Sequence, residues 1–233
     1  MDSSIPVGGR GVASLQMYSM NIEKYKSVIF DLDGTLYDNK GLPLKLVLAD
    51  ILNMWVLGAE RLARKHIKGR DYQDAAGVYD ALFAEMASVK RSLTVDKARR
   101  WYQDKYMPLQ VSLLRIYFAP RPLCVELLEA MRSRGLKVIL YSDYGHEVEK
   151  LDALRIPRDL FDGVVSAAKM GGLKPCQKSM ERLMKLYDLD PATTLYIGDR
   201  EDTDGESARP MQMDFYNVKA NREAWDELLK SFL

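Results

Sequence analysis

The chain has 233 residues, of which 47% are hydrophobic and 29% are charged. A hydrophobic fraction of this size excludes disorder along the whole chain, and the length suffices for one domain or two smaller ones. The 34 lysine and arginine residues nearly balance the 33 aspartate and glutamate residues, which leaves a formal net charge of +1. No nucleic-acid partner is therefore expected. The two cysteines, Cys124 and Cys176, cannot form a disulfide scaffold and are typical of a reducing compartment.

The N-terminal half predicts neither a secretory signal nor a membrane anchor. Residues 1–25 begin with a stretch rich in serine and glycine, lack a basic segment followed by an apolar core, and are expected to form a loose tail. The most apolar stretch, residues 42–59, contains Lys45, Asp50 and Asn53. An aspartate near the centre of a span costs about 2.5 to 3.5 kcal/mol. We therefore expect a cytoplasmic protein without a membrane partner.

Five short apolar runs predict β-strands, at residues 26–30, 137–141, 163–166, 193–197 and 215–218. Helical patterns lie between them. One of these begins at Pro122 and ends at Gly135, which are residue types typical of a helix start and a helix end. Apolar strands that alternate with helices indicate a parallel sheet covered on both faces. The sequence therefore predicts an α/β fold.

One long interval, residues 38–119, contains no clear strand pattern. Apolar residues recur there at helical spacing. The first such stripe comprises Leu44, Val47, Leu48, Ile51 and Trp55. Because the interval follows the first strand, we predict a helical unit of residues 42–117 inserted into an α/β core of residues 26–41 and 118–233.

The first predicted strand leads directly into Asp31-Leu32-Asp33-Gly34-Thr35. Carboxylates at i and i+2 of an extended chain project to the same side, and beside a buried strand they repel each other unless a cation lies between them. Mg²⁺ is the natural counter-ion for such oxygen ligands. Gly34 allows a turn, and Thr35 offers a hydroxyl and a backbone N–H to an anion. The alternative interpretation is an ordinary Asp-Gly turn with incidental acids.

A second acidic cluster follows the strand predicted at residues 193–197. Gly198 and Asp199 come next, and Asp202 and Asp204 follow them. This pattern alone is also typical of a helix N-terminus, where acidic residues are favoured. In open parallel sheets, however, ligands bind beyond the carboxyl ends of the strands. Both acidic clusters lie at such ends, so together they favour a ligand site.

Two further positions are candidates for binding an anion. The strand predicted at residues 137–141 continues into Ser142 and Asp143, and a serine hydroxyl at that place can bond a phosphate oxygen. Lys174, in the sequence GGLKP, can pair with a nucleophilic carboxylate and with phosphate. Taken alone, Ser142 is also typical of an ordinary strand end, and Lys174 is also typical of a surface charge.

In this order, the segments resemble the motifs of the haloacid dehalogenase superfamily. The matching segments are VIFDLDGTL (28–36), VILYSD (138–143), GGLKP (171–175) and LYIGDREDTDG (195–205). The resemblance extends from about residue 26 to the end of the chain, with the helical interval in the place of that family's C1-type cap. It implies a Rossmann-like core, a hydrolase that acts on phosphate esters, and Mg²⁺ as cofactor.

The resemblance also implies a role for each matching residue. Asp31 would be the nucleophile that forms an aspartyl-phosphate, and Asp33 would be the general acid and base. The residues implied to bind the phosphoryl group are Gly34, Thr35, Ser142, Asp143 and Lys174. The residues implied to hold Mg²⁺ are Asp31, Asp33 through its backbone carbonyl, Asp199 and Asp204, with Asp202 as the alternative to Asp204.

Asp33 narrows the reactions that the resemblance allows. Dehalogenases of the superfamily lack this second aspartate, so dehalogenation is not expected. No lysine of the helical interval stands out as a residue for phosphonate hydrolysis, so that reaction is not expected either. We favour a phosphatase of a small phosphorylated metabolite, acting as a monomer or homodimer. The alternatives are a phosphomutase, or a non-catalytic phosphate-binding regulatory module, which would be expected to lack Asp31 or Asp33. Asp143 stands where asparagine is more usual, and its charge would weaken anion binding if it faced the site.

Overall fold

The computed structural model describes residues 21–233, so residues 1–20 of the expected tail lie outside the described residues. Residues Ile22–Lys24 form one 3₁₀ turn, η1. Tyr25 follows it and is buried, and its hydroxyl donates to Asp214 at 2.8 Å. The chain therefore packs against the fold before the first strand begins.

The centre of the fold is a sheet of five parallel strands in the order β3-β2-β1-β4-β5. The strands are β1 (Ser27–Phe30), β2 (Lys137–Ser142), β3 (Gly163–Ser166), β4 (Thr194–Gly198) and β5 (Asp214–Asn217). This arrangement confirms the predicted α/β fold with a parallel sheet. Because β1 lies between β2 and β4, the carboxyl ends of these three strands are neighbours, and the motif residues follow those ends.

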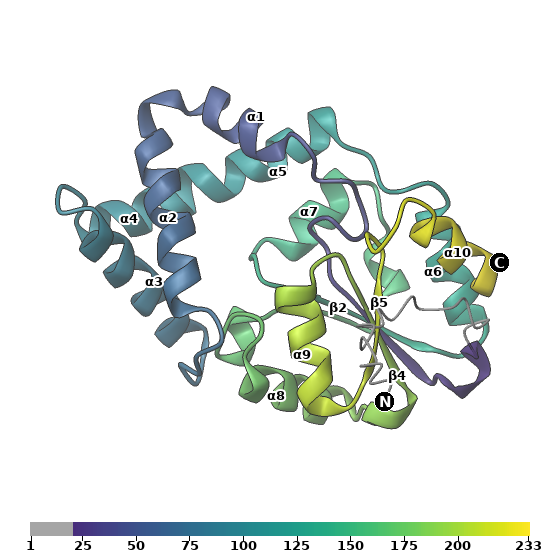
Figure 1. The fold of residues 1–233 in the computed structure, drawn as a ribbon. Helices are drawn as coiled ribbons and strands as arrows, with labels where there is room; N and C mark the ends of the chain where they lie inside the picture. The colour runs from purple at the N-terminus through teal and green to yellow at the C-terminus, as the bar shows by residue number, and fades with distance from the viewer. Residues whose placement is uncertain (1–20) are drawn as a thin grey trace, which may run out of the picture.

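Each face of the sheet has its own apolar layer, because successive strand side chains point to opposite faces. Val28 lies level with Val138 and Leu195 on one face. The helices associated with that face are α6 (Cys124–Ser133), α7 (Glu147–Ala153) and α10 (Ala224–Phe232). Ile29 faces the other side, which is covered by α8 (Gln177–Tyr187) and α9 (Glu206–Ala208). Figure 1 shows α6 and α10 on one side of the sheet and α8 and α9 on the other.

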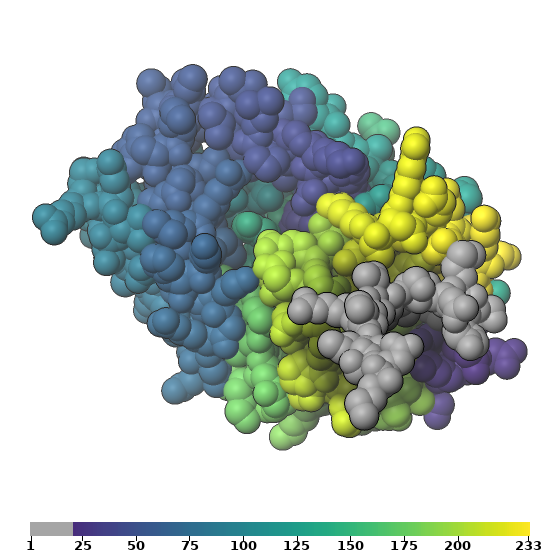
Figure 2. All heavy atoms as spheres, viewed as in Figure 1, coloured from purple at the N-terminus to yellow at the C-terminus, as the bar shows by residue number. Residues whose placement is uncertain are grey.

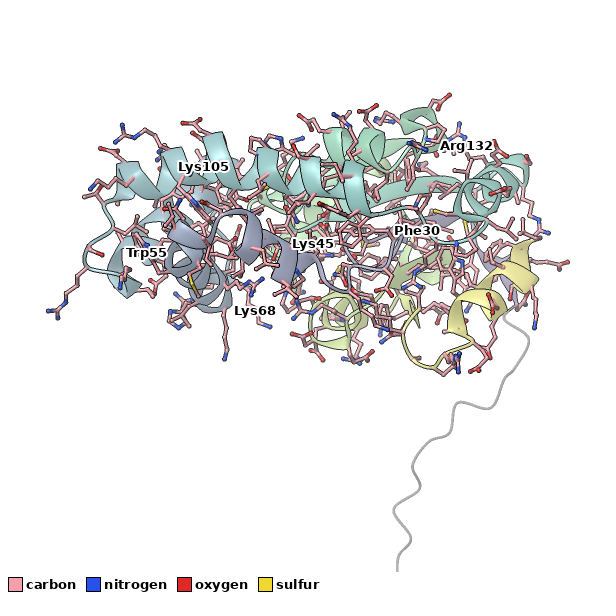
Figure 3. The ribbon with its side chains drawn as sticks, turned by 90° about the horizontal axis from the view of Figure 1, so that it is seen from above. Phe30, Lys45, Trp55, Lys68, Lys105 and Arg132 are labelled. Carbon is pink, nitrogen blue, oxygen red and sulfur yellow. The ribbon has the colours of Figure 1, made fainter. Side chains whose placement is uncertain are left out.

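Helices also fill the interval between β1 and α6. They are α1 (Leu42–Ala49), the 3₁₀ turn η2 (Ile51–Asn53), α2 (Met54–Ile67), α3 (Ala75–Val89), α4 (Val95–Trp101), the π-helical segment η3 (Tyr102–Tyr106) and α5 (Met107–Tyr117). In Figure 3, Trp55 and Lys105 lie at one end of an elongated molecule, and Phe30 and Arg132 lie toward the other. The inserted helices therefore extend away from the sheet.

The predicted apolar stripe of the first inserted helix is wrong. Asp50 has a non-helical backbone conformation and accepts hydrogen bonds from Asn53 and Trp101, so the chain bends by 99° between α1 and the segment that follows it. Of the five residues of this stripe, Leu44, Leu48, Ile51 and Trp55 are exposed, whereas Val47 packs partly buried against the core. Leu42 and Leu46 are the buried residues of α1.

None of the helices within residues 21–233 is by itself long and apolar enough to cross a membrane. The α1 segment and the segment of residues 51–67 reach that length and composition only as a bent pair.

Candidate active site

The motif residues meet at the carboxyl edge of the sheet. Asp31 follows β1, and its backbone N–H donates to the carbonyl of Ile197 in β4 at 2.9 Å. Ser142 is the last residue of β2 and is fully buried. Asp199 follows β4 directly. Three adjacent strands thus deliver a carboxylate, a hydroxyl and a second carboxylate to one place, as the sequence predicts.

Lys174 joins the nucleophile candidate to the second acidic cluster. Its Nζ donates to Asp31 Oδ1 and to Asp204 Oδ1, both at 2.7 Å. The other carboxylate oxygen of Asp31 accepts the hydroxyl hydrogen bond of Thr35 at 2.8 Å. Lys174, Asp31 and Asp204 are all buried. A buried ammonium between two carboxylates satisfies charges that would otherwise be costly to remove from water.

The electrostatics of this cluster favour a further cation. Burial raises the pKa of Asp31 to about 8, because the opposing effect of Lys174 is outweighed by burial together with the negative charges of Asp204 and Asp199. Burial also raises the pKa of Asp199, although Lys219 opposes this. Burial alone would lower the pKa of Lys174, but Asp204 and Asp31 raise it well above its ordinary value. The acids therefore repel one another even with Lys174 present.

Carboxylate oxygens of Asp31, Asp199 and Asp204 lie within 4.8 Å of one another, and these residues fit a divalent cation with oxygen ligands. Asp202, the alternative to Asp204, turns away from them. Its side chain is 56% exposed and pairs with Arg200 and with Lys68, the residue that follows α2. Within the described residues, Asp204 is thus the acid beside Asp31.

Gly34 allows the two acidic segments to approach each other. Its φ is +102°, in the region that favours glycine. A Cβ atom at this position would overlap Oδ2 of Asp199. The carbonyls of Gly34 and Thr35 accept hydrogen bonds from Arg121, at 3.0 and 2.8 Å. Arg121 therefore fixes the backbone of the turn after β1, and Gly34 of the same turn lies against the side chain of Asp199.

The carboxyl group of Asp33 has its own partners, which differ from those of the acidic cluster. The Tyr37 hydroxyl donates to Asp33 Oδ1 at 2.6 Å, and Lys150 Nζ donates to Asp33 Oδ2 at 2.8 Å. The Ser142 hydroxyl lies 3.4 Å from the same Oδ2 atom. The Asp33 backbone carbonyl accepts from Asn39 at 3.2 Å. The carboxyl group is therefore held at both oxygens.

Asp143 is placed so that its carboxylate is already engaged by the loop that carries Lys174. It accepts the backbone N–H of Lys174 at 2.8 Å, and burial raises its pKa despite the nearby Lys174. This contact orients Asp143 as a support for the Lys174 loop. One oxygen of Asp143 is thereby held by that loop.

Three contacts of the site were not predicted from the sequence. Lys150 and Tyr37 hold Asp33, and Lys219 donates to Asp199 Oδ2 at 2.6 Å. Lys150 belongs to a short helix with Glu147 and Glu149 around it, a pattern typical of a solvated face. The spacing of four residues between Asp33 and Tyr37 indicates a contact only if the chain turns tightly between them.

The inserted helices contact this edge of the sheet. The guanidinium carbon of Arg64, in α2, lies 4.1 Å from the ring centroid of Tyr144, a residue just after β2. Lys68 donates to Asp202 at 3.1 Å, and the Gly69 N–H donates to the Leu173 carbonyl at 3.1 Å. Figure 2 shows a hollow where α2 approaches the segments that follow β1 and β4. The site is therefore bordered by helices from both parts of the chain.

Comparison with known proteins agrees with this geometry. Residues 25–211 match the family model of the haloacid dehalogenase-like hydrolases. The chain is 27% identical over 176 residues to a phosphoglycolate phosphatase of Aquifex aeolicus, covering 75% of this chain and 76% of the relative. It is also 27% identical over 198 residues to a glyceraldehyde 3-phosphate phosphatase of Methanocaldococcus jannaschii, covering 81% and 82%.

A solved structure has the same fold. The crystal structure of a predicted phosphoglycolate phosphatase from Haemophilus somnus 129PT superimposes with a TM-score of 0.58 at 21% sequence identity. The match covers 83% of this chain and 85% of the other.

Proposed function

The chain belongs to the haloacid dehalogenase-like hydrolase family, and we propose that it is a Mg²⁺-dependent phosphatase of small phosphorylated metabolites. The observation that carries this proposal is the arrangement around Asp31. One of its oxygens accepts from Lys174 and the other from Thr35, at the edge where ligands bind in parallel sheets. Two relatives named as phosphatases support the same chemistry.

In the proposed reaction, an oxygen of Asp31 attacks the phosphorus atom and the bond from phosphorus to the leaving oxygen breaks. Asp33, which must carry a proton before this step, gives that proton to the leaving oxygen. Asp33 then takes a proton from a water molecule that attacks the aspartyl-phosphate, which releases phosphate and restores Asp31. Lys174 and the Ser142 hydroxyl bind the oxygens of the transferring group and stabilise its charge.

Mg²⁺ fits the carboxylates of Asp31, Asp199 and Asp204 and the carbonyl of Asp33, and when bound it screens the negative charges that oppose attack on a phosphoryl group. The three carboxylates support this assignment because burial and mutual repulsion raise the pKa of Asp31 and of Asp199. Asp33 supports phosphate esters over carbon–halogen bonds as substrates, since an acid is needed to protonate an alkoxide leaving group.

We further propose that residues 42–117 act as a cap over this site and set its choice of substrate. The contacts of Arg64 with Tyr144 and of Lys68 with Asp202 support this role. The Gly69 and Tyr72 N–H groups also donate to the carbonyls of Leu173 and Gly171, next to Lys174. A helical unit held there can exclude water and touch the leaving group.

A screen of phosphorylated metabolites tests the proposal. We expect release of inorganic phosphate from at least one sugar phosphate or small organic phosphate in Mg²⁺, and loss of that activity in EDTA. Parallel assays for isomerised product distinguish a mutase. Isomerisation without net phosphate release, or undiminished phosphate release after dialysis against EDTA, would contradict the proposal.

A further inference from the structure

The most unusual charged group near the site is Lys150, which lies in the middle of α7. Its side chain is 0% exposed. Lysine is almost never fully buried without a partner, because removing an unpaired ammonium from water is strongly unfavourable. The contact that compensates the charge is a hydrogen bond of 2.8 Å from Nζ to Asp33 Oδ2. Asp33 therefore compensates the buried charge of Lys150, and Lys150 in turn holds the carboxyl group of Asp33.

We propose that Lys150 is a positioning residue that aims the carboxyl group of Asp33 at the leaving oxygen of the substrate. The proposal rests on the proposed function, in which Asp33 is the general acid and base. The two oxygens of Asp33 are fixed by different parts of the chain, Oδ1 by Tyr37 after β1 and Oδ2 by Lys150 in α7. With both contacts present, the plane of the carboxyl group is determined.

The surroundings of Lys150 make its position rigid. Its backbone N–H bonds the His146 carbonyl at 2.9 Å, and its Nζ lies 4.9 Å from the ring centroid of Tyr144. The acids of its own helix lie beside other groups, with Glu147 at 3.8 Å from Lys169, Glu149 at 3.6 Å from His146 and Asp152 at 2.7 Å from Arg115. The ammonium of Lys150 is thus directed toward Asp33 rather than toward the acids of α7.

Tyr144 connects this pair to the inserted helices. The guanidinium of Arg64 lies 4.1 Å from the same ring, and a cation near an aromatic ring is attracted to it. Arg64 also donates to the Tyr102 hydroxyl at 2.8 Å. A continuous set of contacts therefore runs from the inserted helices through Arg64, Tyr144 and Lys150 to Asp33. Docking of these helices and placement of the acid are linked through one ring.

Lys150→Met is the central variant, because methionine keeps the apolar length of the side chain and removes the charge. We expect kcat to fall about 10- to 100-fold with KM nearly unchanged, as for a misplaced catalytic group. Lys150→Arg, which keeps a donor and a charge, should recover part of the loss. The matched control is Lys169→Met, which removes a lysine that is 59% exposed and does not contact Asp33. It should leave kcat unchanged.

A double-mutant cycle with Asp33→Asn separates positioning from a structural role. If Lys150 acts through Asp33, adding Lys150→Met to Asp33→Asn changes the residual kcat by less than about threefold. An equal loss of kcat in both backgrounds, with thermal unfolding of all variants cooperative, would overturn the inference. Full activity of Lys150→Met would also overturn it.

The wild-type protein and Asp31→Asn are measured in the same series. If neither releases phosphate, the proposed function itself fails. If the wild-type protein is active and Asp31→Asn is not, the proposed function stands, and the Lys150 variants alone decide the inference.

Discussion

The ammonium of Lys174 lies 2.7 Å from Oδ1 of Asp31, in an environment from which water is largely excluded. The same ammonium reaches Asp204 at 2.7 Å. One cation therefore links the group proposed to attack phosphorus with the group proposed to hold the metal. The sequence separates these three residues widely, and the parallel order of β1 and β4 brings two of them together.

Lys174→Met is expected to lower kcat/KM for every substrate by a similar factor, because Lys174 is proposed to bind the transferring group rather than the leaving group. Asp31 and Asp204 would also lose their shared cation, and removing one partner of a buried ion pair costs about 3 to 5 kcal/mol. We therefore expect a lower Tm as well. Lys178→Met, at a lysine that is 64% exposed, is the control and should change neither quantity. A Lys174→Met protein with a changed substrate ranking would contradict this role.

The acidic cluster makes a prediction about metal affinity that needs no turnover. Asp204→Asn and Asp199→Asn should weaken Mg²⁺ binding by about tenfold or more, because each removes a charged oxygen ligand. Isothermal titration calorimetry measures this directly. Asp202→Asn should bind Mg²⁺ like the wild-type protein, since that side chain pairs with Arg200 and Lys68 instead. Weaker binding by Asp202→Asn alone would reverse the assignment.

Gly34→Ala should abolish activity and weaken Mg²⁺ binding. The new Cβ would overlap Asp199 Oδ2, and the φ of +102° strains any residue with a Cβ. Gly135→Ala is a matched control, because Gly135 has a φ of +77° with open space around the Cβ position. It should lower Tm through backbone strain and leave kcat intact. Equal losses of activity in the two variants would show that the Asp199 contact is unimportant.

Much of the fold follows from the sequence because β1, β2 and β4 are largely apolar and buried and lead into polar motifs. The run predicted at residues 163–166 coincides with β3, and each of the other four differs from its observed strand by one residue at one or both ends. The arrangement of the inserted helices is harder to predict, because the single residue Asp50 turns the chain through its contacts with Asn53 and Trp101. A contact between residues far apart in the sequence, such as Asp50 and Trp101, leaves no periodic pattern in the sequence.

The same limit applies to the site. Asp202 and Asp204 follow the same strand, and only the turn of residues 201–205 decides which faces Asp31. Lys150 and Lys219 lie far from Asp33 and Asp199 in sequence, and nothing local distinguishes them from surface lysines. Residues that bear a motif could be predicted, whereas residues that hold them in place depend on the packing of distant elements.

The proposed cap makes a prediction about substrate choice. Arg64→Met removes the contact with Tyr144, the hydrogen bond to Tyr102 and the ion pair with the buried Glu60. Thermal unfolding of the variant is therefore measured beside its activity. We expect it to change the ratio of kcat/KM values between substrates, unlike Lys174→Met. The comparison should include sugar phosphates, nucleotides and phosphopeptides. Helices that cover the site obstruct a bulky chain, so the highest kcat/KM is expected for a small metabolite. A phosphopeptide with the highest value would contradict the cap role.

The most direct test of the account is phosphate release by Asp31→Asn in saturating Mg²⁺, on the best substrate of the wild-type protein. Asparagine is nearly isosteric with aspartate but cannot form the aspartyl-phosphate. The account predicts a loss of at least about a thousandfold in kcat, with circular dichroism and cooperative unfolding like those of the wild-type protein. A folded Asp31→Asn protein that retains more than about a tenth of the wild-type kcat would contradict covalent catalysis by Asp31.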